Sequence, residues 1–141
     1  MGLSLCRRGV DKLVPASDFT AATTHWTQMT GIFRIDPQAD LQPDPQNPGE
    51  FYVNNFVGDD PGLFAGVWSA ESQETKIDSY PVDEVCVVLA GTITLTAADG
   101  TVSEFRAGDA FAIRKGTALT WANSSDVRKV YAVLDPAARP E

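Results

Sequence analysis

Histidine is almost absent from this chain of 141 residues, which contains only His25. A mechanism that needs two or three imidazoles from one chain is therefore excluded. Cysteine is scarce as well, because Cys6 and Cys86 are the only two and neither belongs to a Cys-x-x-Cys pair. The sequence thus lacks a zinc or redox motif, and we expect two free thiols, as in a reducing compartment.

Basic residues are also few. Lysine and arginine number 11 against 19 acidic residues, which gives a net charge of -8. This balance argues against nucleic acid and against an anionic membrane surface as partners. No apolar run approaches the ~18 residues that span a bilayer, and no apolar segment of a secretion signal follows Arg7 and Arg8. We therefore predict a cytoplasmic protein that has no membrane partner.

The first 50 residues contain little regular pattern. A short helix is predicted at 17–22 and a strand at Gly31–Asp36. The next segment holds Pro37, Pro43, Pro45 and Pro48, and proline removes the N–H donors that a strand needs. We predict an N-terminal arm and proline-rich connector at 1–50, a folded unit at 51–134 and a tail at 135–141.

From residue 51 the pattern changes to short strand-like runs that are separated by turn residues. They recur about every 8–12 residues, which is typical of an all-β sandwich or barrel. Asp99-Gly100 is a hairpin signal between two of them. The predicted strands are 51–57, 63–70, 74–80, 85–90, 92–96, 101–106, 110–113, 119–123 and 127–134.

Two glycine-containing spacings in this unit resemble the motifs of the cupin superfamily. Glu84 is followed by six residues and Gly91, as at the end of the first cupin motif. Gly108, Gly116 and Asn123 have the spacing of the second motif, although Arg114 replaces its proline and Leu119 its histidine. The sequence is more similar to the (S)-ureidoglycine aminohydrolase subfamily in a set of shorter matches: Gly66-Val67-Trp68, Tyr80, Ala107-Gly108-Asp109, Thr120-Trp121, Val127-Arg128-Lys129 and Tyr131.

The resemblance implies an all-β, cupin-type jelly-roll barrel with a pocket between its sheets. Because side chains alternate along a strand, it also implies which residues face inward. The predicted ligand-binding residues are Trp68, Tyr80, Glu84, Leu119, Trp121 and Tyr131. The alternative is that both tryptophans are ordinary core residues, since small barrels are filled by their own side chains.

Glu84 stands where related cupins ligate a divalent ion beside three histidines, and none of those histidines is present here. We therefore predict no metal and no other cofactor. Without a metal, Glu84 and Tyr80 are the candidate catalytic acid and base. Alternatively, Tyr80 or Lys129 holds the Glu84 carboxylate in a structural role. For Lys129 itself a solvated strand face is expected, with an anion-binding role in the pocket as the alternative.

These observations predict a metal-free cupin that binds a small molecule inside the barrel. The alternative is an enzyme, whether an isomerase, a lyase or a ureidoglycine aminohydrolase-like hydrolase, that uses Glu84 and Tyr80 as acid and base. A structural or regulatory subunit is a further alternative. The resemblance also implies a homodimer, in which the strand at Gly31–Asp36 pairs along a sheet edge.

Overall fold

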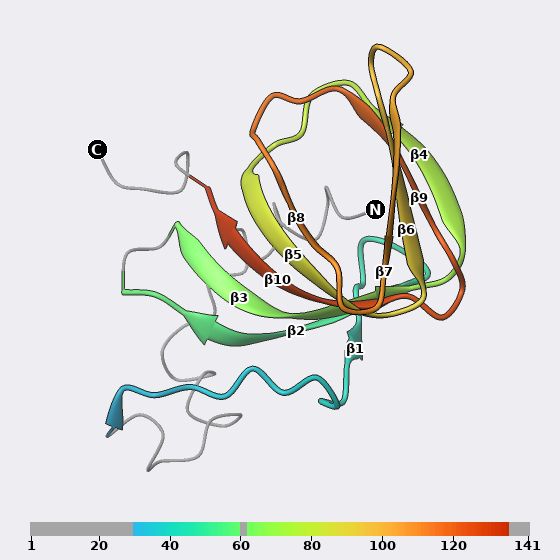
Figure 1. Ribbon diagram of the computed structural model, residues 1–141. Coiled ribbons are helices and arrows are strands. Elements are labelled where there is room, and N and C mark those ends of the chain that lie inside the picture. Colours follow the sequence, from blue (N-terminus) through green and yellow to red (C-terminus); the bar gives the residue numbers. More distant parts are fainter. Residues whose placement is uncertain (1–29, 60–61, 136–141) are drawn as a thin grey trace.

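The computed structural model describes residues 30–59 and 62–135, and these residues fold into two antiparallel β-sheets that face each other (Figure 1). No helix in this part of the chain is long and apolar enough to cross a membrane. The strands are β1 (Gln42–Pro43), β2 (Glu50–Val57), β3 (Leu63–Ala70), β4 (Gln73–Ile77), β5 (Asp83–Ala90), β6 (Thr92–Ala97), β7 (Val102–Arg106), β8 (Ala110–Ile113), β9 (Leu119–Asn123) and β10 (Arg128–Leu134).

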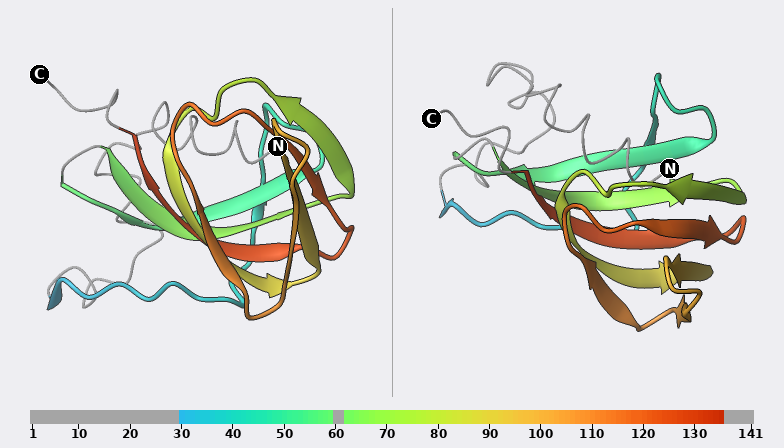
Figure 2. Two further views of the ribbon diagram at one scale, coloured as in Figure 1. Left: turned by 45° about the horizontal axis from the view of Figure 1, so that its top comes forward. Right: turned by 90° about the horizontal axis from the view of Figure 1, so that it is seen from above.

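The larger sheet has the strand order β1-β2-β3-β10-β5-β8, and the smaller sheet has the order β4-β9-β6-β7. Figure 2 (right) shows the strands of the larger sheet side by side from β2 to β8. Every strand predicted between residues 51 and 134 is present, with ends displaced by three residues at most. The predicted all-β jelly-roll fold is confirmed.

Two glycines allow close approaches that a side chain would prevent. A Cβ at Gly66 on β3 would lie 1.8 Å from the Val53 carbonyl oxygen on β2, where the register shifts between Asn54 and Phe56. Gly91 joins β5 to β6 with a φ of 72°, and a Cβ there would lie 2.6 Å from Ser124 Oγ. Only glycine fits these positions without displacing the backbone around them.

The strand predicted at Gly31–Asp36 is wrong, because these residues form no strand. Ile32 is 72% exposed, and the segment contacts the sheet through Phe33, whose ring packs edge-on against Phe56 of β2 with ring centres 5.3 Å apart, without pairing as a strand. The segment that does pair is the two-residue β1, further along the chain, which lies antiparallel to β2. The helix predicted at 17–22, together with Cys6 and His25, lies outside the described residues.

Alternation along the strands separates an inner from an outer face, as the sequence pattern predicts. On β5, Glu84, Cys86 and Val88 are buried, whereas Val85 and Val87 are exposed. On β9, Leu119, Trp121 and Asn123 are buried in the same way. The inward side chains of both sheets thus meet in one core, and the functional candidates are found there.

Candidate functional site

Lys129 occupies the centre of the space between the sheets, and its side chain has no exposed surface. It lies on β10 two residues before Tyr131, so both side chains point inward. The solvated face expected for Lys129 is therefore wrong. Arg128, its neighbour on the outer face, instead donates hydrogen bonds to the carbonyl oxygens of Pro37 and Ala39.

The Glu84 carboxylate is the counter-ion of this buried ammonium. Lys129 Nζ lies 2.6 Å from Glu84 Oε2, and both side chains are fully buried. The Tyr80 hydroxyl donates to Glu84 Oε1 at 2.8 Å, and the Cys86 thiol donates to Oε2 at 2.9 Å. Three donors thus meet at one carboxylate, as a buried charge requires. The contacts predicted for the structural alternative, from Tyr80 and Lys129 to Glu84, are confirmed.

Two tryptophans enclose the ammonium from the sides. Lys129 Nζ lies 4.7 Å from the Trp68 ring centre and 4.6 Å from that of Trp121. Both distances are within the range of cation–π attraction. The indole N–H of Trp68 donates to Glu50 Oε1 at 3.0 Å, and that of Trp121 donates to Asn123 Oδ1 at 3.1 Å. The polar atoms of the rings are therefore satisfied inside the core.

Cys86 completes the cluster, and its environment keeps the thiol protonated. Burial raises the pKa of Cys86 well above its ordinary value, and the negative charge of Glu84 raises this pKa further. The Lys129 ammonium, whose Nζ lies 3.5 Å from Sγ, opposes both effects but is outweighed. A protonated, buried thiol is a poor nucleophile. The geometry assigns Cys86 the role of a hydrogen-bond donor to Glu84.

An open cavity of about 470 Å³ lies beside this closed cluster, where strands β6 and β7 face β8. Phe105 and Phe111 stack in its wall with ring centres 4.4 Å apart. Phe111 also packs against Trp121, so a layer of aromatic rings separates the cavity from Lys129. The remaining lining consists of Leu95, Ala97, Thr101, Ser103, Ala112, Ile113, Arg114, Thr117 and Leu119. We call this space the mouth cavity.

The mouth cavity has polar groups that the protein itself does not satisfy. Among the described residues, neither the Ser103 hydroxyl nor the Arg114 guanidinium has a hydrogen-bond or ion-pair partner. The Thr117 hydroxyl donates to the Arg114 carbonyl oxygen at 2.7 Å. A mostly apolar cavity with a few converging polar groups is the usual form of a small-molecule site.

Residues 62–131 match the family model described as the EutQ-like cupin domain. The protein therefore contains an EutQ-like cupin domain. No curated protein matches the chain at a significant level. The finer resemblance to the ureidoglycine aminohydrolase subfamily is not among the relationships that these comparisons support.

Solved structures with the same fold include several proteins of unknown function. A DUF861-family protein of unknown function from Pseudomonas syringae is 26% identical, with a TM-score of 0.63 over 70% of this chain and 46% of that one. The chain thus spans less than half of that protein's length. The EutQ protein of Clostridium difficile is 18% identical, with a TM-score of 0.58 over 74% of this chain and 94% of that one.

A putative ethanolamine utilization protein Q from Salmonella typhimurium is 19% identical and has a TM-score of 0.51. That comparison covers 60% of this chain and 68% of the Salmonella protein. At this level of identity, the likeness to either EutQ protein concerns the fold alone.

The cupin site does not fit a divalent metal ion. Glu84, at the cupin ligand position, already holds the Lys129 ammonium at 2.6 Å, and a second cation there would be repelled. Leu119 supplies no donor atom. Within residues 30–59 and 62–135, no three His, Cys, Asp or Glu side chains gather as a metal site would require.

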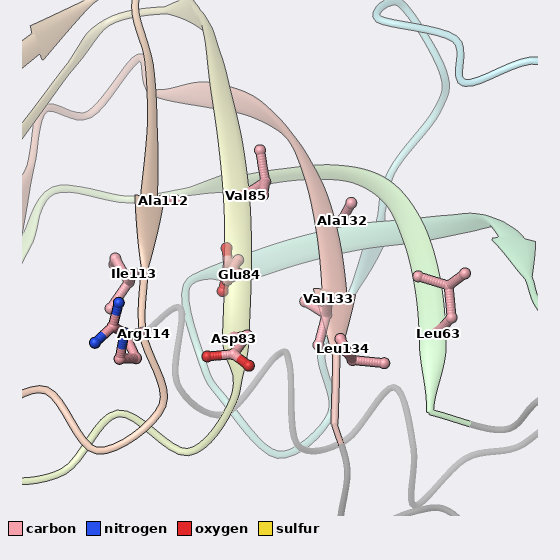
Figure 3. Close-up of a pocket in the computed structure, with 10 residues that line it drawn as sticks. All are labelled: Leu63, Asp83, Glu84, Val85, Ala112, Ile113, Arg114, Ala132, Val133 and Leu134. Carbon is pink, nitrogen blue, oxygen red and sulfur yellow. The ribbon is translucent and has the colours of Figure 1, made fainter.

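The six predicted ligand-binding residues separate into two groups in this cupin. Trp68, Tyr80, Trp121 and Tyr131 are fully buried, and none of them lines the mouth cavity. They belong to the core. Tyr131 donates from its hydroxyl to the Val53 carbonyl oxygen at 3.1 Å. Leu119 lines the mouth cavity, and Glu84, although its side chain points inward, is also among the residues around a second cavity along β5, β8 and β10 (Figure 3).

The sequence did not predict that Lys129 points inward, and it did not identify Ser103 and Phe111 as lining residues of the mouth cavity. The signal for Lys129 was available, since Tyr131 was assigned inward and residues two apart on a strand share a face. Ser103 and Phe111 are harder to find, because they come from strands that are far apart in the chain and meet only when the two sheets close.

Proposed function

We propose that this protein is a metal-independent, small-molecule-binding cupin whose ligand occupies the mouth cavity. The observation that carries the proposal is the cavity of about 470 Å³ between the sheets, with an aromatic wall and the exposed polar side chains of Ser103 and Arg114 at its surface. A volume of this size falls within the ~300–1,000 Å³ of typical ligand sites. The Lys129–Glu84 cluster supports this cavity from behind through Trp121 and Phe111.

The lining favours a ligand with an apolar, ring-sized body and one anionic group. Phe105, Phe111 and Leu95 offer apolar contact, while the Arg114 guanidinium supplies a fixed positive charge at the edge of the cavity. An arginine fork pairs well with a carboxylate. Small aromatic or branched carboxylates are therefore the class that we expect to bind.

A filling variant and its matched control test the site. Ser103→Phe places a ring in the cavity, whereas Val102→Phe places the same ring on the outer face of β7. Native mass spectrometry of the purified full chain should show a copurifying small molecule, or added benzoate, bound to wild type and Val102→Phe but lost from Ser103→Phe. If wild type and both variants bind alike, or if wild type binds nothing, the proposal is wrong.

Arg114→Gln tests the charge preference. The variant should raise the dissociation constant for benzoate at least tenfold. The dissociation constant for benzamide, the neutral isostere, should stay within about twofold of wild type, because an amide does not need the guanidinium. Equal losses for both probes would show that Arg114 shapes the cavity and does not select an anion.

An enzyme that uses Glu84 and Tyr80 as acid and base is the second candidate, and their 2.8 Å hydrogen bond favours it. Both side chains are at most 1% exposed, so a substrate would have to displace the ring layer of Phe111 and Trp121 to reach them. Turnover of a bound ligand that Glu84→Gln abolishes, while binding persists, would select this candidate. Binding without turnover at any pH from 5 to about 9 would reject it.

A further inference from the structure

The carboxylate that stands at the metal-ligand position of the cupin motif binds a cation of the chain itself. Glu84 Oε2 contacts the Lys129 ammonium at 2.6 Å, and both side chains are fully buried. The site thus contains a positive charge, and this charge reaches it on a side chain of β10. The groups around the ammonium determine which class of cation the site suits.

The groups around Lys129 Nζ are those that recognise a primary ammonium. The Glu84 carboxylate supplies a negative charge and accepts an N–H of the ammonium. The ring centres of Trp68 and Trp121 lie 4.7 and 4.6 Å from Nζ, where cation–π attraction favours a cation. The Cys86 sulfur lies 3.5 Å from Nζ and accepts a weaker hydrogen bond. We call Glu84, Cys86, Trp68 and Trp121 the ammonium cage.

The ammonium cage is held in place by contacts other than those to Lys129. Its walls come from β3, β5 and β9, whereas Lys129 comes from β10. The two indole rings pack edge-on against each other, with ring centres 5.8 Å apart. Three of the walls also have a hydrogen bond to a residue outside the cage: Trp68 donates to Glu50, Trp121 donates to Asn123, and Glu84 accepts from Tyr80. A cage supported in this way should survive the removal of its occupant.

A divalent metal ion is a poor match for this cage. Magnesium and calcium need a shell of oxygen ligands, and zinc needs several nitrogen, sulfur or carboxylate donors. The cage offers a single carboxylate and a single thiol, and the rest of its surface is indole, which has no lone pair to donate. An alkylammonium needs no such shell, because a carboxylate and two ring faces match its charge.

We propose that the cupin site of this protein is an alkylammonium-binding site whose resident ligand is the chain's own Lys129 side chain. The lysine is a tethered ligand, which fills the site and keeps metal ions and free amines out of it. Its stem enters from β10, where the sheet register sets Lys129 opposite Trp68 on β3 and Val88 on β5. Truncation to alanine removes the atoms from Cγ to Nζ, which correspond to the heavy atoms of n-propylammonium. The freed space therefore has the shape and the charge to take up that amine.

A small amine has a short route to the freed space. Phe111 lines the mouth cavity and packs against Trp121, so a layer of rings separates that cavity from the ammonium cage. Engineered cavities in the cores of other proteins bind molecules as large as benzene. The tethered ligand does not require a ligand in the mouth cavity, so its test is independent of the function proposed above.

Lys129→Ala tests the site, and Lys76→Ala is its matched control, since Lys76 is an exposed strand lysine on β4. Calorimetry of the full chain at about pH 7, where the amine is protonated, should show n-propylammonium bound to Lys129→Ala and not to wild type or Lys76→Ala. The neutral isostere 1-propanol should bind Lys129→Ala at least tenfold more weakly, because it lacks the charge that the cage matches. Adding Glu84→Gln to Lys129→Ala should reduce this preference to about threefold or less.

Stability provides a second readout, which also covers a variant that does not fold in buffer alone. A ligand that binds only the folded state stabilises it. The urea midpoint of Lys129→Ala should therefore rise with n-propylammonium, relative to wild type in the same salt, and should not rise with 1-propanol. If Lys129→Ala is unfolded in buffer, n-propylammonium should restore the folded state on dilution from urea.

Several results would overturn the tethered-ligand proposal. One is that n-propylammonium neither binds nor stabilises Lys129→Ala, and another is that 1-propanol does so equally well. Binding of the amine to wild type with the same affinity would place it at a different site. Stabilisation of Lys129→Ala by Mn²⁺ beyond that by n-propylammonium would show that the freed site prefers a metal ion.

Discussion

The space between the two sheets is divided into a closed region and an open one, and the two differ in how their polar groups are satisfied. Around Lys129, the ammonium, the carboxylate, the thiol and the phenol all find partners within the protein. In the mouth cavity, Ser103 and Arg114 find none among the described residues. A polar cluster whose groups all pair within the protein stabilises a fold, whereas exposed polar groups beside apolar walls are able to exchange water for a ligand.

The largest effect is expected from breaking the buried ion pair. Glu84→Gln removes the carboxylate charge that the fully buried Lys129 ammonium contacts at 2.6 Å. Removing one partner of a buried pair typically costs about 3–5 kcal/mol. Urea denaturation should show this loss in the free energy of unfolding, and a loss below about 1 kcal/mol would contradict the assignment of the region as closed.

Removing the charge of Lys129 should cost less than removing that of Glu84. After Lys129→Met, the carboxylate still accepts from Tyr80 and Cys86 and is able to take up a proton, so a loss of about 1–3 kcal/mol is expected. The double variant Glu84→Gln with Lys129→Met should recover at least half of the Glu84→Gln loss, because no unpaired charge remains. Additive losses would show that the two side chains do not act as a pair.

The closed region should also make stability depend on pH in the alkaline range. The folded state holds the Cys86 thiol protonated because its pKa is raised, while the unfolded thiol ionises at about 8.5. The resulting stabilisation is full below about pH 8.5 and is lost as the pH rises above that value. Wild type should therefore lose more free energy of unfolding between pH 8 and about 10.5 than Cys86→Ala does. Parallel pH curves for the two proteins would contradict the raised pKa.

The smallest effect is expected in the open region. Ser103→Phe adds a ring to an open cavity, so the free energy of unfolding should change by less than about 1 kcal/mol. Val88→Phe adds a larger side chain to the closed core, where Val88 is 1% exposed, and should cost about 1–3 kcal/mol or more. Thermal unfolding of the two variants compares the regions directly, and equal losses would remove the distinction between them.

The strands were predictable because their signals are local. Runs such as Leu63–Ala70 and Leu119–Asn123 are bounded by turn residues, and the structure gives them the predicted ends. The exception is instructive, since Gly31–Asp36 has strand-like residues but no strand to pair with. A strand requires a neighbour, and propensity alone does not supply one.

The candidate site was predictable only in part. Glu84 and Tyr80 were identified from their spacing, and their hydrogen bond is present. The rest depends on which side chains reach each other across the two sheets. Phe111 on β8 lies against Phe105 on β7 although the strands belong to different sheets. The sequence of either strand alone does not indicate that these two rings are in contact.

The jelly-roll fold and the inward direction of Glu84 and Trp121 were implied by the resemblance to cupins. The residues by themselves determined where the strands lie, which side chains of a strand share a face, and the lack of the histidines that a metal would need. Each of these follows from residue type and from the two-residue period of a strand. Only the tertiary structure decided that Lys129 neutralises Glu84 between two tryptophan rings and that the open space lies beyond them. Burial and pairing depend on the closure of one sheet over the other, which brings together residues far apart in the chain.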